Sequence, residues 1–286
     1  MKEQMFTATE LAPGILQLTG PLGFCASLII GSRRALLFDT MGGIGDLKGY
    51  VSSLTSLPLT VVNSHGHFDH AAGNYQFDEV WISPAEYDNT LVLRDGELRR
   101  QLFQEVEESQ NIHLPEELRA PLVAGTFDRY LFLSDGQIFD LGGRTAQVVP
   151  LPGHTPGSVG LLLPEDGILL SGDAMTPVMC LFFPESLPLS AYKETLLKAQ
   201  KLPWSHFVTG HMTRLLPKSL LNDFLASVDA VSSLKGMRYQ FNLLPKYGGW
   251  LYLYKTDGPR EEETLGVILR EPRPGDNPPV RKRKMP

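Results

Sequence analysis

The hydrophobic positions of the chain form short strand-like runs with helical stripes between them. The apolar runs at 25–30 and 35–40 are separated by Gly31-Ser32-Arg33-Arg34, which is typical of a hairpin. Further short strands are expected at 59–64, 79–83, 137–141, 145–151, 159–163, 168–172 and 206–209. Strands at such short intervals, with helices between them, predict sheets that are covered by helices.

Four segments carry apolar side chains at helical spacing. They cover 46–56, 98–109, 192–201 and 217–234, where apolar residues recur every three or four positions. Pro217 opens the last of them, at a first-turn position that proline favours. The charged segment at about 84–127 holds the second helix and interrupts the strands. We therefore treat it as a helical insertion, either a lid or a surface decoration.

The character of the chain changes after residue 235. Apolar runs at 250–254 and 265–269 predict a β-hairpin across the charged loop 255–264. Residues 272–286 contain five prolines and the basic run 281–284, so we expect a disordered, basic, proline-rich tail. The predicted organisation is a main domain over 1–235, a C-terminal hairpin extension over 236–271, and the tail.

Composition and charge exclude several classes of protein. Hydrophobic residues make up 42% and charged residues 20% of the 286 positions, which is typical of a folded domain with a sizeable core. The absence of a run of about 18 apolar residues predicts no membrane span. The net charge of -6 argues against a general nucleic-acid-binding surface. Two free cysteines, and a start without the pattern of an export signal, lead us to expect a cytoplasmic protein.

The strongest chemical signal follows the run at 59–64. The sequence His65-Gly66-His67-Phe68-Asp69-His70 places three imidazoles and one carboxylate within six residues. Imidazole and carboxylate are ligands of zinc and similar divalent ions, and a short loop after a strand can aim them at one point. The motif therefore predicts a metal site.

Three further candidate ligands each follow the end of an expected strand. His154 lies in a Pro-Gly-His-Thr-Pro-Gly loop after 145–151, Asp173 follows 168–172, and His211 follows 206–209. Taken singly, each is more often a loop residue that makes hydrogen bonds. Together with the motif they supply five histidines and two aspartates, which is enough for two metal ions.

With these motifs in place, the chain resembles the metallo-β-lactamase-fold hydrolase superfamily, in its glyoxalase II-like or lactonase-like branch. Five segments carry the resemblance in the family's order: Phe38-Asp39-Thr40, residues 65–70, the loop 151–157, Ser171-Gly172-Asp173 and Gly210-His211. The resemblance implies an α/β (α+β) fold for residues 1–235, a four-layer αββα sandwich of two sheets with helices outside. Residues 1–235 would then be the catalytic domain.

The resemblance also implies a set of site residues. One metal ion would be bound by His65, His67 and His154, the other by Asp69, His70 and His211, with Asp173 bridging the two and Asp39 supporting the ligand loop from behind. The cofactors would be two divalent metal ions, zinc first, with iron or manganese as alternatives.

These residues predict a hydrolase whose metal-bridging hydroxide attacks a carbonyl ester, thioester or lactone of a small molecule. Asp69 would accept the proton of the nucleophile as a catalytic residue. The bridging Asp173 is generally lacking in true metallo-β-lactamases, so an antibiotic-degrading role is disfavoured. A phosphodiesterase or nuclease of the same fold, and a non-catalytic metal-binding protein, remain as alternatives.

Three expectations concern partners and the pocket. The expected partner is a small-molecule substrate, with neither nucleic acid nor membrane. The hairpin at 250–269 offers an edge through which a homodimer would form. The apolar run at 177–183 favours a pocket for a hydrophobic acyl or aromatic group, although the same residues also suit a core.

Overall fold

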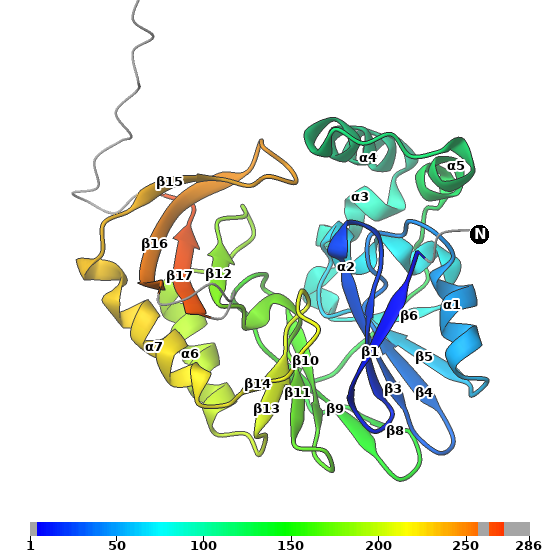
Figure 1. Cartoon of the computed structure of the whole chain (residues 1–286), viewed down its shortest axis with the longest axis horizontal. Coiled ribbons are helices and arrows are strands. Elements are labelled where there is room, and N and C mark those ends of the chain that lie inside the picture. Colours follow the sequence, from blue (N-terminus) through cyan, green and yellow to red (C-terminus); the bar gives the residue numbers. More distant parts are fainter. Residues whose placement is uncertain (1–4, 257–262, 272–286) are drawn as a thin grey trace, which may run out of the picture.

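Two β-sheets lie face to face in the middle of the molecule, which is a computed structural model that describes residues 5–256 and 263–271 (Figure 1). The first sheet has seven strands in chain order: β1 (Thr7–Ala12), β2 (Ile15–Thr19), β3 (Cys25–Ile30), β4 (Ala35–Phe38), β5 (Leu59–Val62), β6 (Val80–Ile82) and β7 (Tyr130–Phe132). The second has the order β14-β13-β11-β10-β9-β8: β14 (Leu216–Pro217), β13 (His206–Val208), β11 (Ile168–Leu170), β10 (Val159–Leu163), β9 (Thr145–Pro150) and β8 (Ile138–Asp140).

Each sheet is buried on both faces. Successive side chains of a strand point to opposite faces, and in β4 Leu36 enters the core between the sheets while Leu37 enters the core on the outer face. In β10, Leu161 and Leu162 divide in the same way. Continuous apolar runs in the sequence therefore correspond to strands that are covered on two sides.

Helices cover the two outer faces. Outside the first sheet lie α1 (Leu47–Leu54), α2 (Phe68–Ala71), α3 (Leu91–Arg94), α4 (Gly96–Gln110) and α5 (Glu116–Ala124). Outside the second sheet lie α6 (Leu189–Gln200) and α7 (Leu220–Ala230). The order helix, sheet, sheet, helix confirms the predicted α/β fold with its αββα layers (Figure 1).

A third sheet of four strands, which the sequence did not predict as such, packs beside α6 and α7. Its order is β12-β17-β16-β15: β12 (Val178–Leu181), β17 (Thr264–Leu269), β16 (Gly248–Thr256) and β15 (Met237–Gln240). The expected hairpin is present as β16 and β17, and β17 also pairs in parallel with β12 of the preceding region. Trp250, Tyr252 and Val267 share one core with α6 and α7.

The third sheet therefore joins the region after residue 235 to the rest of the chain through backbone hydrogen bonds and a common core. The division into a catalytic domain over 1–235 and an extension over 236–271 stays a prediction. The predicted tail at 272–286 lies outside the described residues.

One local prediction is wrong. Pro217 is not in the first turn of a helix but in β14, where it lies opposite His206, and α7 begins at Leu220. Because β14 is an edge strand, a residue without an N–H is tolerated there. Across residues 5–256 and 263–271, every helix is too short or too polar to cross a membrane.

Candidate metal centre and active site

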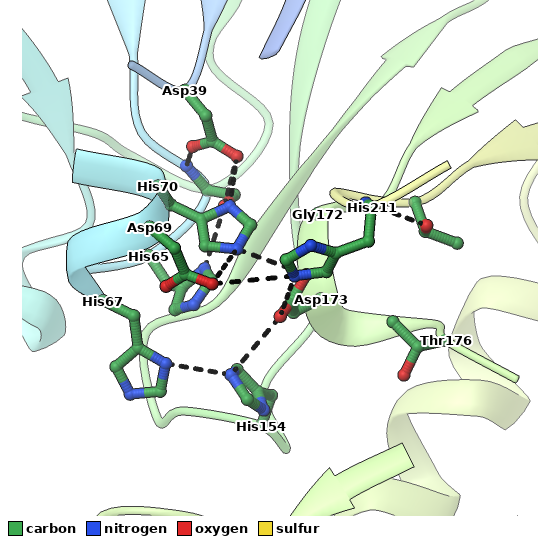
Figure 2. A network of polar contacts seen from close by, with 12 residues as sticks. Asp39, His65, His67, Asp69, His70, His154, Gly172, Asp173, Thr176 and His211 are labelled. Carbon is green, nitrogen blue, oxygen red and sulfur yellow. Dashed lines mark hydrogen bonds and ion pairs between the residues drawn. The ribbon is translucent and has the colours of Figure 1, made fainter. Parts of the chain in front are cut away.

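The seven predicted ligands come together at one rim of the two central sheets (Figure 2). They follow the C-terminal ends of four strands: His65, His67, Asp69 and His70 come after β5, His154 after β9, Asp173 after β11, and His211 after β13. β11 and β13 run in parallel, as do β4 and β5, so these strands end at the same edge of their sheets. Segments more than 140 residues apart thus meet at one place.

Possible ligand atoms form three overlapping groups, each within 4.8 Å. The groups are His65, His67 and His154; His65, His70 and Asp173; and Asp69, His70 and His211. Nδ1 of His67 lies 3.0 Å from Nε2 of His154. The carboxylate of Asp173 lies between the outer groups, 3.2 Å from His211 Nε2 and 3.8 Å from His154 Nε2. The arrangement matches the two predicted metal sites with a shared aspartate.

The buried polar atoms of the cluster fit metal ions. Nε2 of His65, Nε2 of His70 and Oδ1 of Asp173 are buried and have no hydrogen-bond partner within the described residues. Leaving such atoms unpaired costs free energy, whereas a cation at the centre would satisfy all three. Nitrogen and oxygen donors together suit zinc, iron or manganese.

Electrostatics prepares the histidines differently. Burial, together with the neighbouring imidazoles, lowers the pKa of His65, and it lowers the pKa of His154 to about 4. Both rings are therefore neutral near pH 7, with a lone pair free to bind a cation. Burial also opposes the charged form of His70, but Asp173, Asp69 and Asp39 raise its pKa above the usual value. Carboxylate charge is thus concentrated around His70.

Hydrogen bonds from behind orient four of the imidazole rings. The second nitrogen of each ring meets an oxygen: His70 Nδ1 with Asp39 Oδ2 at 2.8 Å, His65 Nδ1 with Ser64 Oγ at 2.9 Å, His67 Nε2 with Glu185 Oε1 at 2.6 Å, and His154 Nδ1 with the Cys180 carbonyl at 2.8 Å. Such contacts select the tautomer and the direction of a ligating ring. The sequence predicted Asp39 but missed the other three, because no motif marks them.

Asp39 is held in an unusual conformation for this task. Its φ of 73° lies in the left-handed region that non-glycine residues rarely adopt. From there Oδ1 accepts the Ser64 N–H at 2.7 Å and Oδ2 accepts the Ser64 hydroxyl at 2.8 Å. One buried carboxylate thus orients both the start of the ligand loop and His70, as the predicted supporting role requires.

A second buried carboxylate, Glu86, was not predicted from the sequence. It lies in the first turn of the insertion and is fully buried. Oε2 accepts the Gly66 N–H at 2.9 Å, and Oε1 accepts the Gly157 N–H at 2.7 Å. Glu86 therefore connects the loop of His65 and His67 to the loop of His154. A single glutamate within a charged segment carries no sequence pattern that reveals such a role.

A cavity of about 650 Å³ opens in front of the cluster. His67, Asp69, His154, Asp173 and His211 contribute to its wall. The run 177–183 takes both roles that its sequence allows: Cys180 and Phe183 line the cavity, while Met179 and Leu181 point into the core beside α6 and α7. Alternation along β12 explains the division.

Named relatives agree with the site. The human acyl-coenzyme A thioesterase MBLAC2 is 32% identical over 169 residues, which cover 52% of this chain and 57% of the relative. The hydroxyacylglutathione hydrolase GloC of Haemophilus influenzae is 26% identical over 157 residues, 53% of this chain and 66% of the relative. The chain thus spans less than two thirds of the length of either protein. Both relatives are named as hydrolases.

Solved structures share the fold. A metallo-beta-lactamase family protein from Thermus thermophilus superposes with a TM-score of 0.56 at 21% identity, over 79% of this chain and 85% of the other. The sec-alkylsulfatase Pisa1 from Pseudomonas sp. gives a TM-score of 0.62 at 13% identity, over 78% of this chain and 42% of the other. The family model of the metallo-beta-lactamase superfamily matches residues 20–235, well over half of the chain. The resemblance read from the motifs is therefore confirmed, and the chain belongs to the metallo-beta-lactamase superfamily.

Proposed function

We propose that the chain is a dinuclear metal-dependent hydrolase that cleaves a thioester, carbonyl ester or lactone of a small molecule. The observation that carries the proposal is the convergence of seven ligand side chains around buried, unpartnered nitrogen and oxygen atoms. Two ions fit three overlapping groups that share His65 and His70. Zinc is the proposed metal; a cytoplasmic location and a homodimer through β16 and β17 stay predictions.

Each group of residues has a role in this proposal. His65, His67 and His154 would hold one ion, Asp69, His70 and His211 the other, and Asp173 both. The ions would supply Lewis acidity and a water whose pKa is lowered toward neutrality. Oδ2 of Asp69 faces the cavity beside His70 and His211, at 3.6 and 3.7 Å from their Nε2 atoms. From there Asp69 would accept the proton of the attacking water.

Two observations support a carbonyl substrate over a phosphodiester. The relatives named as a thioesterase and as a hydroxyacylglutathione hydrolase are carbonyl-bond hydrolases. Among the described residues that line the cavity, Lys246 is the one Lys or Arg side chain, and it lies 2.6 Å from Glu105. Phosphodiester-binding sites need free positive charge around the phosphate, which this lining does not offer.

Metal content and turnover test the proposal on one sample. Elemental analysis of the purified full chain should find two divalent ions per molecule, and a panel of thioesters, lactones and phosphodiesters should show turnover on the first two classes. Asp173→Asn should lower activity by more than about 100-fold, the upper range for losing an outer-shell partner, because it removes the shared ligand charge. Asp229→Asn, which changes an exposed aspartate paired with Lys193, is the matched control.

Several outcomes would contradict the proposal. Full activity in Asp173→Asn would exclude the shared-ligand arrangement. Phosphodiester cleavage without carbonyl-bond cleavage would favour the nuclease alternative. A metal-loaded protein that turns over no member of the panel would favour the binding-only alternative.

A further inference from the structure

We propose that the cavity contains a dedicated subsite for a long hydrocarbon group of the substrate, which rests on the proposed hydrolase function. We call this subsite the apolar wall. Its residues come from three parts of the chain: Leu91 and Leu98 from the insertion, Phe183 from the segment after β12, and Phe241, Leu243 and Tyr247 from the segment between β15 and β16.

The apolar wall begins directly at the ligand cluster. The ring of Phe183 lies 4.6 Å from the ring of His67 and 5.5 Å from the ring of His154, centre to centre. From Phe183 the aromatic contacts continue to Tyr247 at 5.4 Å and to Phe241 at 5.8 Å. A substrate held at the cluster would therefore meet an unbroken apolar surface next to the bond that is cleaved.

Two leucines of the wall are exposed without a structural reason. Leu91 has 51% and Leu98 has 38% of its surface accessible, and both line the cavity. Large exposed apolar side chains that gather in one concave place mark a binding surface more often than isolated ones do. A hydrocarbon group in the cavity would remove this surface from water.

The charges of the lining are already paired. Of the acidic and basic side chains that line the cavity away from the cluster, Glu105 and Lys246 pair with each other at 2.6 Å, and Glu185 pairs with His67. The described part of the wall therefore offers no unpaired charge to an ionic group. It selects an uncharged, apolar one.

The two sides of the wall are fastened to each other. Ser109 Oγ donates to the Leu243 carbonyl at 2.7 Å, and Gln110 Nε2 donates to the Asn242 carbonyl at 3.0 Å. Figure 1 shows the loop between β15 and β16 reaching toward α4. The subsite is thus a preformed part of the fold, and binding does not have to order either segment.

Chain length of the substrate tests the wall. One series consists of straight-chain acyl thioesters of N-acetylcysteamine, from acetyl to dodecanoyl; the other consists of thioacetates of alkyl thiols of the same lengths. With the metal-loaded full chain, we expect kcat/KM in one series to rise about fourfold per added methylene and then level off when the cavity is full. The series that rises shows which side of the bond occupies the wall.

Binding without turnover separates this inference from the proposed function. Alkyl thioethers of N-acetylcysteamine lack the carbonyl, and their Kd values by calorimetry should fall with chain length in the same way. No dependence on length in either substrate series, with acetyl turnover present, would overturn the wall and leave the hydrolase. Absent turnover with length-dependent thioether binding would overturn the hydrolase and keep the subsite. Absence of both would overturn both.

Exposed positions supply variants that leave the core intact. Leu98→Ser and Leu91→Ser should each lower the ratio of dodecanoyl to acetyl kcat/KM, or of the corresponding thioacetates, by about tenfold. Leu98→Trp should make the rise level off at a shorter chain. Ile138→Ser is the matched control, because Ile138 is 60% exposed on β8 and does not line the cavity. A ratio that changes equally in Ile138→Ser would contradict the wall.

Discussion

The ligand cluster and the apolar wall meet in one cavity but are built in opposite ways. The cluster stands on short loops after central strands, and its histidines are held from behind by Asp39, Glu185 and backbone groups. The wall consists of accessible side chains on an insertion and on a connection between edge strands, held by a few hydrogen bonds. The difference teaches that the chemistry is fixed by the scaffold, while the substrate group that fits is set by peripheral segments.

Glu86 is the point where the two regions are joined. It begins the insertion that carries one side of the wall, yet its carboxylate accepts hydrogen bonds from both ligand loops. The insertion is therefore more than a surface decoration or a lid, because the spacing of the ligand loops depends on its first turn.

Glu86→Gln should give the largest effect on this junction. The amide keeps one acceptor oxygen but turns an NH₂ group toward the N–H of Gly66 or Gly157, so one ligand loop loses its partner. We expect metal affinity, measured by competition with a chromogenic chelator, to fall up to about 100-fold, as for other groups behind metal ligands. Glu97→Gln, at an exposed site of the same insertion, is the control. Unchanged metal affinity in Glu86→Gln would show that the insertion acts on the wall alone.

Arg99→Met should break the attachment of the wall to the sheet. The buried Arg99 donates to the carbonyl of Ala72, next to the ligand helix α2, at 2.7 Å and to that of Leu122 in α5 at 2.5 Å. Losing both donors leaves two carbonyls unpaired, so the free energy of unfolding should fall by about 2 kcal/mol in urea titration.

Two neighbouring changes control this experiment. Arg99→Lys keeps one donor and should recover part of the loss. Arg100→Met removes only an exposed ion pair with Glu97 and should change stability little. Equal losses in Arg99→Met and Arg100→Met would contradict the attachment.

Glu107→Gln should give the smallest effect and one that depends on pH. Burial opposes the charged form of Glu107, but the hydrogen bonds from Arg119 at 2.9 Å and from the Leu114 N–H at 3.0 Å lower its pKa below the usual 4.5. The stabilisation is therefore complete above the pKa of the unfolded chain and is lost as pH falls through the lower pKa of the folded one. We expect a loss of about 1 kcal/mol at pH 7.

The pH series itself is the measurement. Urea unfolding of wild type and Glu107→Gln should show a constant difference above about pH 5 that narrows below pH 4.5. A difference that widens toward acid pH would mean that Glu107 is not held by Arg119. Activity at neutral pH should change less than in Glu86→Gln, since Glu107 joins α4 to α5 and does not reach the ligand loops.

Local patterns were reliable where a strand is central and its ligand follows at once. The runs around 59–64 and 168–172 correspond to β5 and β11, and the candidate ligands after them lie in the cluster. Pro217 and β12 were misread or missed because an edge strand of two residues and a strand that is half pocket and half core give no clear alternation. Glu86 and Glu185 were missed because their partners are 20 to 118 residues away in the sequence.

By itself, the sequence determined the αββα layers and the identity of the candidate ligands, because hydrophobic period and dense histidine motifs are properties of adjacent residues. Only the tertiary structure decided which oxygens orient the rings, that β12 joins the C-terminal strands, and that the insertion and residues 241–247 share one apolar surface. Those features depend on distances between segments that chain folding alone brings together, and no local pattern encodes such distances.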